Sequence, residues 1–284
     1  MDSSELLVLL QNSFPSAITA VGSIVGCLFT VIFLRNNTAV NEFEMIKAGL
    51  FKEAAEEMLK NGKMTYTEFY KANNFLKVAQ LADEFYKDNK DRDSNKKYDF
   101  DWFIRFYENV GNISDQHMQE IWAKILAGEI CNPGTHSIHL LEILKYVSKN
   151  DAELFEKVCS VSLEITNQVL LPNYKQYLDE FEISYDAILR LNELNLINSN
   201  GMLVLSLKVP PQRAELCRGN SSRIAIQSLS NNAVDYNINE FPFTSVGREL
   251  RSILTIKIPD KCLELLITEL SKNKDISFEL LKLS

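Results

Sequence analysis

The hydrophobic and polar positions divide the chain into one long apolar segment followed by several amphipathic ones. Residues 17–34, AITAVGSIVGCLFTVIFL, contain no charged side chain, and as a helix they would extend about 27 Å, close to the hydrocarbon thickness of a bilayer. The pattern therefore predicts a single N-terminal transmembrane helix. A cleaved signal peptide and a buried core helix stay open as alternatives, although the acidic Asp2 and Glu5 are not typical of a signal peptide.

Small residues within this segment predict how the helix would be used. Gly22 and Gly26 form a G-x-x-x-G pattern, which lets helix backbones approach closely in a membrane, so we expect association into a homo-oligomer. Small and hydroxyl-bearing side chains share one helical face and are candidates for lining a pore; they are Thr19, Ser23, Cys27 and Thr30. Basic residues occur only after the segment, which predicts an N-terminus outside and a large cytoplasmic part.

Amphipathic helical patterns follow the apolar segment. Across 38–60 and again across 65–85, apolar side chains recur every three or four residues, which predicts a helical hairpin. Residues 87–97 have no apolar side chain and mix both charge signs, as is typical of a solvated linker. From 98 to 182, helical patterns with aromatic core positions are joined by short loops, so we expect a helical domain. The expected helix starts are Thr65 with Glu68, Ser114, Ser137, and Ser148 with Asp151.

The pattern changes after residue 183. A short helix is followed by two apolar runs within 194–207, separated by an Asn-Ser-Asn-Gly turn, which predicts a β-hairpin and hence a winged-helix-like domain. Strands are also expected near 223–229 and 236–243, and helices near 245–254 and 260–272. The predicted fold class is mainly α with a small α+β part. The predicted domains are an N-terminal segment with the transmembrane helix (1–37), a helical hairpin with the linker (38–97), a helical domain (98–182) and a winged-helix-like domain (183–284).

Composition narrows the classes of function. Of the 284 residues, 46% are hydrophobic and 24% are charged, which is typical of a folded protein rather than a disordered one. The formal net charge of −8 argues against duplex DNA binding through bulk electrostatic attraction. Five widely spaced cysteines favour reduced thiols over a disulfide framework or a thiolate zinc site.

Motifs for catalysis and metal binding are absent or weak in the sequence. It contains no Walker, dinucleotide-binding, nucleophile-elbow or H-E-x-x-H motif. His136, His139 and Glu142 lie close in sequence, but a helix that begins near Ser137 would not bring all three side chains together. We therefore expect no enzyme activity, no cofactor and no metal site, and a hydrolase within the helical domain is the third-ranked hypothesis.

One basic cluster contrasts with the acidic composition. Its members are Lys208, Arg213, Arg218 and Arg223. Neighbouring proline and glycine residues predict an exposed loop with backbone N–H donors from Gly219 to Ser222, and such donors together with guanidinium groups bind phosphate. We expect a nucleotide or a short single-stranded oligonucleotide as ligand, while a solvated loop with spaced charges is the plainer alternative. The preceding helix carries Arg190 against Asp186 and Glu193, so protein contact is its expected use rather than DNA reading.

The helical domain resembles an uncharacterised bacterial family associated with abortive infection, a form of phage defence. The similarity rests on W-F-x-x-F-x-E from Trp102, on I-S-D-x-x-M-Q-x-x-W-A-K-I-L-A-G-E from Ile113, and on a third motif between Pro133 and Phe155. His136 and His139 depart from the family pattern. With an N-terminal anchor, the architecture resembles the membrane-channel effectors of Hailong anti-phage defence.

The resemblance and the patterns together lead to one hypothesis and one alternative. The hypothesis is a single-pass protein of the bacterial inner membrane that forms a homo-oligomeric ion channel or pore in anti-phage defence, gated by a ligand bound to its cytoplasmic domains. The alternative is a non-conducting, membrane-anchored scaffold or sensor that recruits a cytosolic defence partner. The motifs of the family imply no catalytic role.

Overall fold

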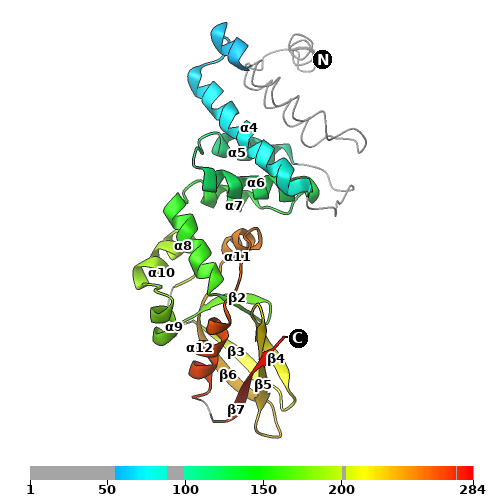
Figure 1. The fold of residues 1–284 in the computed structure, drawn as a ribbon, viewed down its shortest axis with the longest axis vertical. Helices are drawn as coiled ribbons and strands as arrows, with labels where there is room; N and C mark the ends of the chain where they lie inside the picture. The colour runs from blue at the N-terminus through cyan, green and yellow to red at the C-terminus, as the bar shows by residue number, and fades with distance from the viewer. Residues whose placement is uncertain (1–54, 88–98, 200–202, 273, 284) are drawn as a thin grey trace. The chain divides into compact units, whose positions relative to one another are not determined.

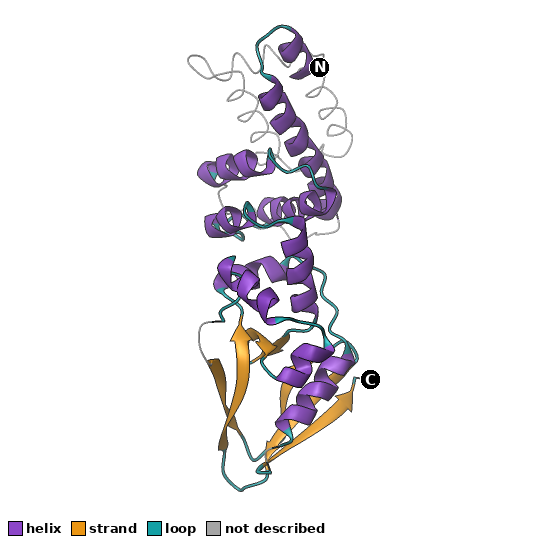
Figure 2. Ribbon diagram, turned by 90° about the vertical axis from the view of Figure 1, so that its left-hand side faces the viewer, coloured by secondary structure: helices purple, strands orange, loops and turns teal. Residues whose placement is uncertain are grey.

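The structure is a computed structural model that describes residues 55–87, 99–199, 203–272 and 274–283. The chain divides into two compact units, Met1–Lys145 and Tyr146–Ser284, and each unit is presented separately. Helices and strands carry the labels of Figure 1. The described strands, orange in Figure 2, belong to the second unit.

The described part of the first unit is helical. Its labelled helices are α4 (Tyr66–Lys87), α5 (Phe100–Val110), α6 (Gln116–Cys131) and α7 (Ile138–Leu144). Phe75 of α4 meets the ring of Phe103 of α5 edge-on at 5.8 Å between centroids, and Phe106 meets Trp122 of α6 at 5.4 Å. All four side chains are fully buried, so the prediction that these aromatic residues form the core is confirmed.

Side-chain caps determine where these helices begin. Thr65 and Glu68 form the expected reciprocal pair: the Glu68 carboxylate accepts the Thr65 backbone N–H at 2.8 Å, and the Thr65 hydroxyl accepts the Glu68 N–H at 3.3 Å. Asp115, rather than the expected Ser114, caps α6, because its carboxylate accepts the N–H of Met118 at 3.1 Å. The short-range sequence pattern thus locates helix starts to within a residue.

The second unit combines helices with two antiparallel sheets, whose strand orders are β1-β2-β6-β3 and β4-β5-β7. Its elements in chain order are α8 (Lys149–Ser160), β1 (Leu163–Ile165), β2 (Gln168–Pro172), α9 (Lys175–Glu180), α10 (Tyr185–Glu193), β3 (Leu203–Val209), β4 (Ala214–Arg218), β5 (Ser222–Ser228), β6 (Val234–Pro242), α11 (Ser245–Ser252), α12 (Asp260–Leu270) and β7 (Ile276–Lys282). When β1, β4 and β5 are left out, the order α8, β2, α9, α10, β3, β6, with β6 between β2 and β3, matches the connectivity of a winged helix. Strands β4 and β5 are an insertion between the two wing strands.

The pairing of β3 differs from the sequence prediction. Instead of forming a hairpin within 194–207, β3 pairs with β6, from Leu203 opposite Glu240 to Val209 opposite Val234, and Ile197 bridges Phe243. The alternation of apolar and polar residues that predicted a strand is real, but it does not specify the partner strand. The strands expected near 223–229 and 236–243 and the two C-terminal helices are confirmed as β5, β6, α11 and α12.

The second unit also begins earlier than the predicted boundary at residue 183. Strand β2 pairs with both β1 and β6, so β1 and β2 belong to the same sheet as the later strands β3 and β6. Helices α8 and α9 flank these two strands in the sequence. The boundary between the compact units accordingly falls at residue 146. The predicted segments 1–37 and 38–54 and most of the linker lie outside the described residues.

The predicted fold class and location need correction. Within the described ranges, no helix is both long enough and apolar enough to cross a membrane. The predictions of an N-terminal transmembrane helix and of a single-pass inner-membrane protein are therefore not supported. Segment 17–34 lies outside the described residues. The same holds for the residues predicted to associate helices, Gly22 and Gly26, and for those predicted to line a pore, Thr19, Ser23, Cys27 and Thr30. The described fold is α+β with two sheets, rather than mainly α with a small mixed part.

Candidate functional site

The predicted loop of basic residues is a β-hairpin. Strands β4 and β5 pair antiparallel, and Arg218 lies directly opposite Arg223. Arg213 immediately precedes β4, whereas Lys208 belongs to β3 in the other sheet, opposite Asp235. The structure therefore brings Arg218 and Arg223 together, and we call these two residues the arginine pair.

The hairpin is held by its inner face. Ile224 and Ile226 of β5 are buried at 0% and 4% exposure, and α12 packs on β5 and β7. Side chains alternate between the two faces of a strand, so Arg223 projects from the opposite face. A β-bulge between Glu215 and Cys217 adds one residue to β4 and brings Glu215 to the same face as the arginine pair.

The arginine pair converges on one carboxylate. Arg218 donates from Nε and Nη2 to the two oxygens of Glu215 at 3.1 and 3.0 Å, and Arg223 Nη1 donates to Glu215 Oε2 at 3.1 Å. The hydrogen bonds from Arg218 are the main cause of a lowered pKa at Glu215, and this carboxylate in turn raises the pKa of Arg218. Arg213 forms a separate ion pair with Glu279. The trio of two arginines and one glutamate thus carries a net positive charge.

The backbone donors expected in the turn are already used. Gly219 N–H donates to the Ser222 carbonyl at 2.8 Å, and Asn220 N–H donates to the Ile258 carbonyl at 3.3 Å. Ser221 N–H lies 3.4 Å from a carboxylate oxygen of Asp260, the first residue of α12. The turn is therefore fixed to the start of α12, and an anion would be held by the arginine side chains rather than by the turn backbone.

Arg223 has one further donor. Its Nε is buried and has no hydrogen-bond partner among the residues that the structure describes. A buried N–H without an acceptor is unfavourable. If an anionic ligand replaced Glu215, the Arg223 guanidinium group would be able to rotate, and its Nε–H would be able to donate to the ligand. This spare donor is the second feature of the pair, after the convergence on Glu215, that suits an anionic ligand.

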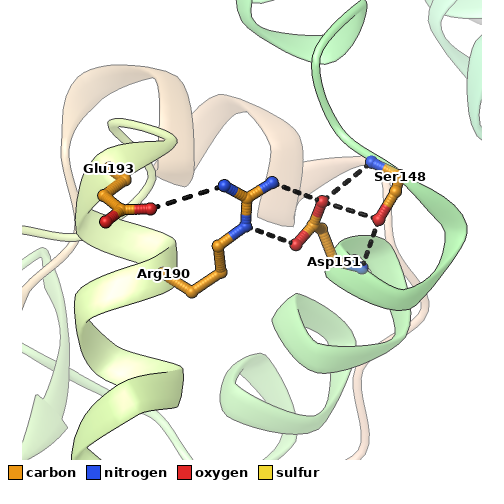
Figure 3. A network of polar contacts seen from close by, with 4 residues as sticks. All are labelled: Ser148, Asp151, Arg190 and Glu193. Atoms are coloured by element: carbon orange, nitrogen blue, oxygen red, sulfur yellow. Dashed lines mark hydrogen bonds and ion pairs between the residues drawn. The ribbon is translucent and has the colours of Figure 1, made fainter.

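A second polar network links α8 to α10, and sequence reasoning did not foresee the link (Figure 3). Asp151 and Ser148 form the expected capping box at the start of α8. The same Asp151 carboxylate accepts from Arg190 Nε at 2.8 Å and Nη2 at 2.9 Å. These bonds hold the pKa of Asp151 well below its usual range. Because the two residues are 39 positions apart, no local pattern indicated their contact.

The signature motif of the helical domain has a structural explanation. Glu129 is buried, and its carboxylate accepts the backbone N–H of Gly134 at 2.6 Å and of His136 at 3.1 Å, which fixes the loop after α6. Burial raises the pKa of Glu129 in spite of these bonds. A Cβ atom at Gly128 would lie 2.5 Å from His136 Nε2, so the glycine allows the ring to pack there. These residues shape the loop, and nothing in their geometry indicates catalysis.

The weak metal motif is dispersed in the structure. His136 is buried, His139 is exposed, and Glu142 forms ion pairs with Lys145 and Arg105. In the part of the chain that the structure describes, no three histidine, cysteine, aspartate or glutamate side chains are placed to hold a metal ion. The described cysteines are buried and form no disulfide; they are Cys131, Cys159, Cys217 and Cys262.

Comparison with known proteins identifies a family without an assigned activity. Residues 61–267 match the model of the family described as "Protein of unknown function (DUF2806)". The match includes the helices of the first unit from α4 onward and nearly all of the second unit, including the arginine pair. Neither a curated protein nor a solved structure matches the chain. The chain therefore belongs to the DUF2806 family.

Proposed function

We propose that this protein is a non-enzymatic receptor for a phosphate-bearing ligand, a nucleotide or a short single-stranded oligonucleotide, bound by the arginine pair. The observation that carries the proposal is the convergence of three N–H donors from Arg218 and Arg223 on the single carboxylate of Glu215. Two guanidinium groups around one anionic group form the arrangement that binds phosphate oxygens. Glu215 occupies that position within the protein.

The ligand would have to displace Glu215, and the structure suits such an exchange. The side chains of Arg218, Arg223 and Glu215 are 56%, 42% and 36% exposed, and ion pairs at such exposed positions contribute little to stability. A terminal phosphate, as on a nucleotide or at the end of an oligonucleotide, offers more acceptor oxygens than a carboxylate and carries up to two negative charges. Exchange of Glu215 for phosphate would therefore gain hydrogen bonds at a small cost in folding free energy.

The surroundings favour a small ligand over a duplex. Glu279 lies beside Arg213, and the whole chain carries a net charge of −8. A long duplex would bring many phosphates near these acidic groups, whereas one or two phosphates can be held by the arginine pair alone. The resemblance of the helical domain to abortive-infection proteins supports phage defence as the setting, with the ligand as a signal and a defence partner as the target.

The proposal is tested by titration of the full chain with three probes: a fluorescent single-stranded oligonucleotide, a cyclic dinucleotide and duplex DNA. Replacing both arginines with glutamine should weaken binding of the preferred probe by about tenfold or more, because each lost charge-assisted bond contributes strongly. Glu215→Gln should strengthen binding, since it removes the competing carboxylate. Lys208→Gln is the matched control, because Lys208 belongs to the other sheet, and it should bind as the wild type does.

Two further readouts make the test decisive. Binding should weaken as salt rises, and more steeply for the wild type than for the double glutamine variant. Thermal melts of each variant check that the fold is kept, which exposed charges rarely change. The proposal is wrong if the double variant binds like the wild type, or if neither the wild type nor Glu215→Gln binds any of the three probes.

A further inference from the structure

Helix α10 presents an apolar and acidic face to solvent. Tyr185 and Leu189 are 66% and 37% exposed, and their four-residue spacing places them on one side of the helix. Asp186 and Glu193 are exposed on the same helix. We call these four residues the α10 face. Large exposed apolar side chains that are grouped, rather than scattered, often mark sites of protein contact.

The orientation of this helix is fixed by its other side. Ile188 and Leu191 are 1% and 0% exposed and pack into the core of the second unit. The Ser184 hydroxyl accepts the Ala187 N–H at 3.1 Å and caps the helix start. The α10 face therefore cannot turn inward without exposing the buried side of the helix.

The only basic residue of α10 is already engaged. Arg190 donates twice to Asp151, at 2.8 and 2.9 Å, and once to Glu193 at 3.4 Å (Figure 3). Asp151 accordingly neutralises its charge, and Asp186 leaves the face acidic. In the winged-helix connectivity α10 has the position of the recognition helix, yet an acidic face repels the phosphates that a groove-reading helix must approach.

We propose that the α10 face docks a segment of another protein in which apolar side chains alternate with lysine or arginine. Charge complementarity selects this partner, because apolar groups would cover Tyr185 and Leu189 while basic groups would pair with Asp186 and Glu193. A second copy of this chain fits less well, since its net charge of −8 would oppose association. The proposal is independent of the ligand, because the arginine pair belongs to β4 and β5.

Site-specific photo-crosslinking of the full chain in its native host tests the proposal. A photoreactive benzoylphenylalanine at Leu189 should give a discrete protein adduct, whose cross-linked segment, mapped by mass spectrometry, contains basic next to apolar residues. Asp186→Lys in the same chain should reduce the adduct several-fold, with the melting temperature kept. The same photoreactive residue at Val204, which is 46% exposed on β3, is the control and should not give this adduct.

Each remaining outcome contradicts the proposal. These outcomes are an adduct with a second copy of the chain, an adduct with nucleic acid, a cross-linked segment without basic residues, an adduct that Asp186→Lys leaves unchanged, and no adduct above the Val204 control. Ligand titration of the Asp186→Lys variant separates the two proposals. Binding at the arginine pair should be unchanged even where docking at the α10 face is lost.

Discussion

Replacing Asp151 with alanine should destabilise the second unit at the junction of α8 and α10. The Asp151 side chain is only 9% exposed, and it accepts from the Ser148 N–H at 2.9 Å, the Ser148 hydroxyl at 2.7 Å and the Arg190 guanidinium at 2.8 and 2.9 Å. Alanine removes all four bonds. It leaves the Ser148 N–H without its capping partner and the guanidinium without its carboxylate.

The magnitude follows from these contacts. Loss of the Asp151 half of the capping box, whose Ser148 half is kept, costs about 1 kcal/mol. Loss of hydrogen bonds to the charged Asp151 carboxylate adds about another 1 kcal/mol, the low end of the usual range, because Arg190 is 45% exposed and solvent replaces part of the interaction. The free energy of unfolding should therefore fall by about 2 kcal/mol. Arg190→Ala should cost less, since Asp151 keeps both Ser148 donors.

Hydrogen exchange measured by mass spectrometry on the full chain is the suitable assay, because it reports α8 and α10 separately from the first unit. Amides in both helices should exchange faster in Asp151→Ala. The double variant with Arg190→Ala should be less destabilised than the sum of the single variants, since they share one interaction. Lys149→Ala is the control: its pair with Glu153 is exposed at both ends and 3.9 Å long, so the change should stay under about 0.5 kcal/mol.

The effect should also depend on pH. The lowered pKa of Asp151 means that its contribution is present above the ordinary aspartate value of 3.8 and is lost as pH falls below it. The difference between wild type and Asp151→Ala should stay constant from about pH 5 to 8 and shrink below about pH 4. Equal exchange rates in α8 and α10 of both proteins at neutral pH would refute the reasoning.

Two further substitutions test the packing of the second unit. Gly247→Ala would place a Cβ atom 1.9 Å from the Leu196 carbonyl oxygen, so the melting temperature should fall with a loss of roughly 2–3 kcal/mol, whereas Ser245→Ala at the exposed start of α11 should be nearly neutral. Glu240 is 4% exposed with one oxygen unpartnered among the described residues, and burial raises its pKa. The protonated form of Glu240, which suits the buried site, is therefore lost as pH rises. Glu240→Gln should raise the free energy of unfolding by about 1 kcal/mol at pH 7, because the amide stays neutral. This advantage should disappear below about pH 4.5, and denaturant titrations of both proteins at each pH measure it.

The features that the sequence predicts well are local. Helix starts depend on residues three positions apart, as Thr65 and Glu68 or Ser148 and Asp151 show, so their types and spacing suffice to locate them. The aromatic core of the first unit follows from helical periodicity, because positions such as Phe103 and Phe106 return to the same face of a helix.

The features that it misses depend on distant partners. The sequence predicts that β3 pairs with the apolar run before it, within residues 194–207. In the structure β3 instead pairs with β6, which follows the inserted strands β4 and β5. Alternation fixes which face of a strand is buried and leaves the partner open. The contact between Asp151 and Arg190 is hidden for the same reason, since it depends on how α8 packs against α10 rather than on either helix alone.

The proposed ligand site shows this limit at a single residue. In a regular strand, Glu215 and Arg218 would point to opposite faces, because side chains alternate and the two are three positions apart. The bulge between Glu215 and Cys217 adds one residue to β4, so both side chains reach the face where Arg223 also lies. Proline and glycine in the sequence correctly indicate a turn. The alternation of buried and exposed side chains that is typical of a strand is broken at the bulge, however, so the sequence pattern of β4 resembles a loop. The geometry on which the proposed phosphate binding depends therefore arises from one irregularity in strand pairing. A substitution that restores regular pairing there would separate Glu215 from the arginine pair without removing any of the three charges.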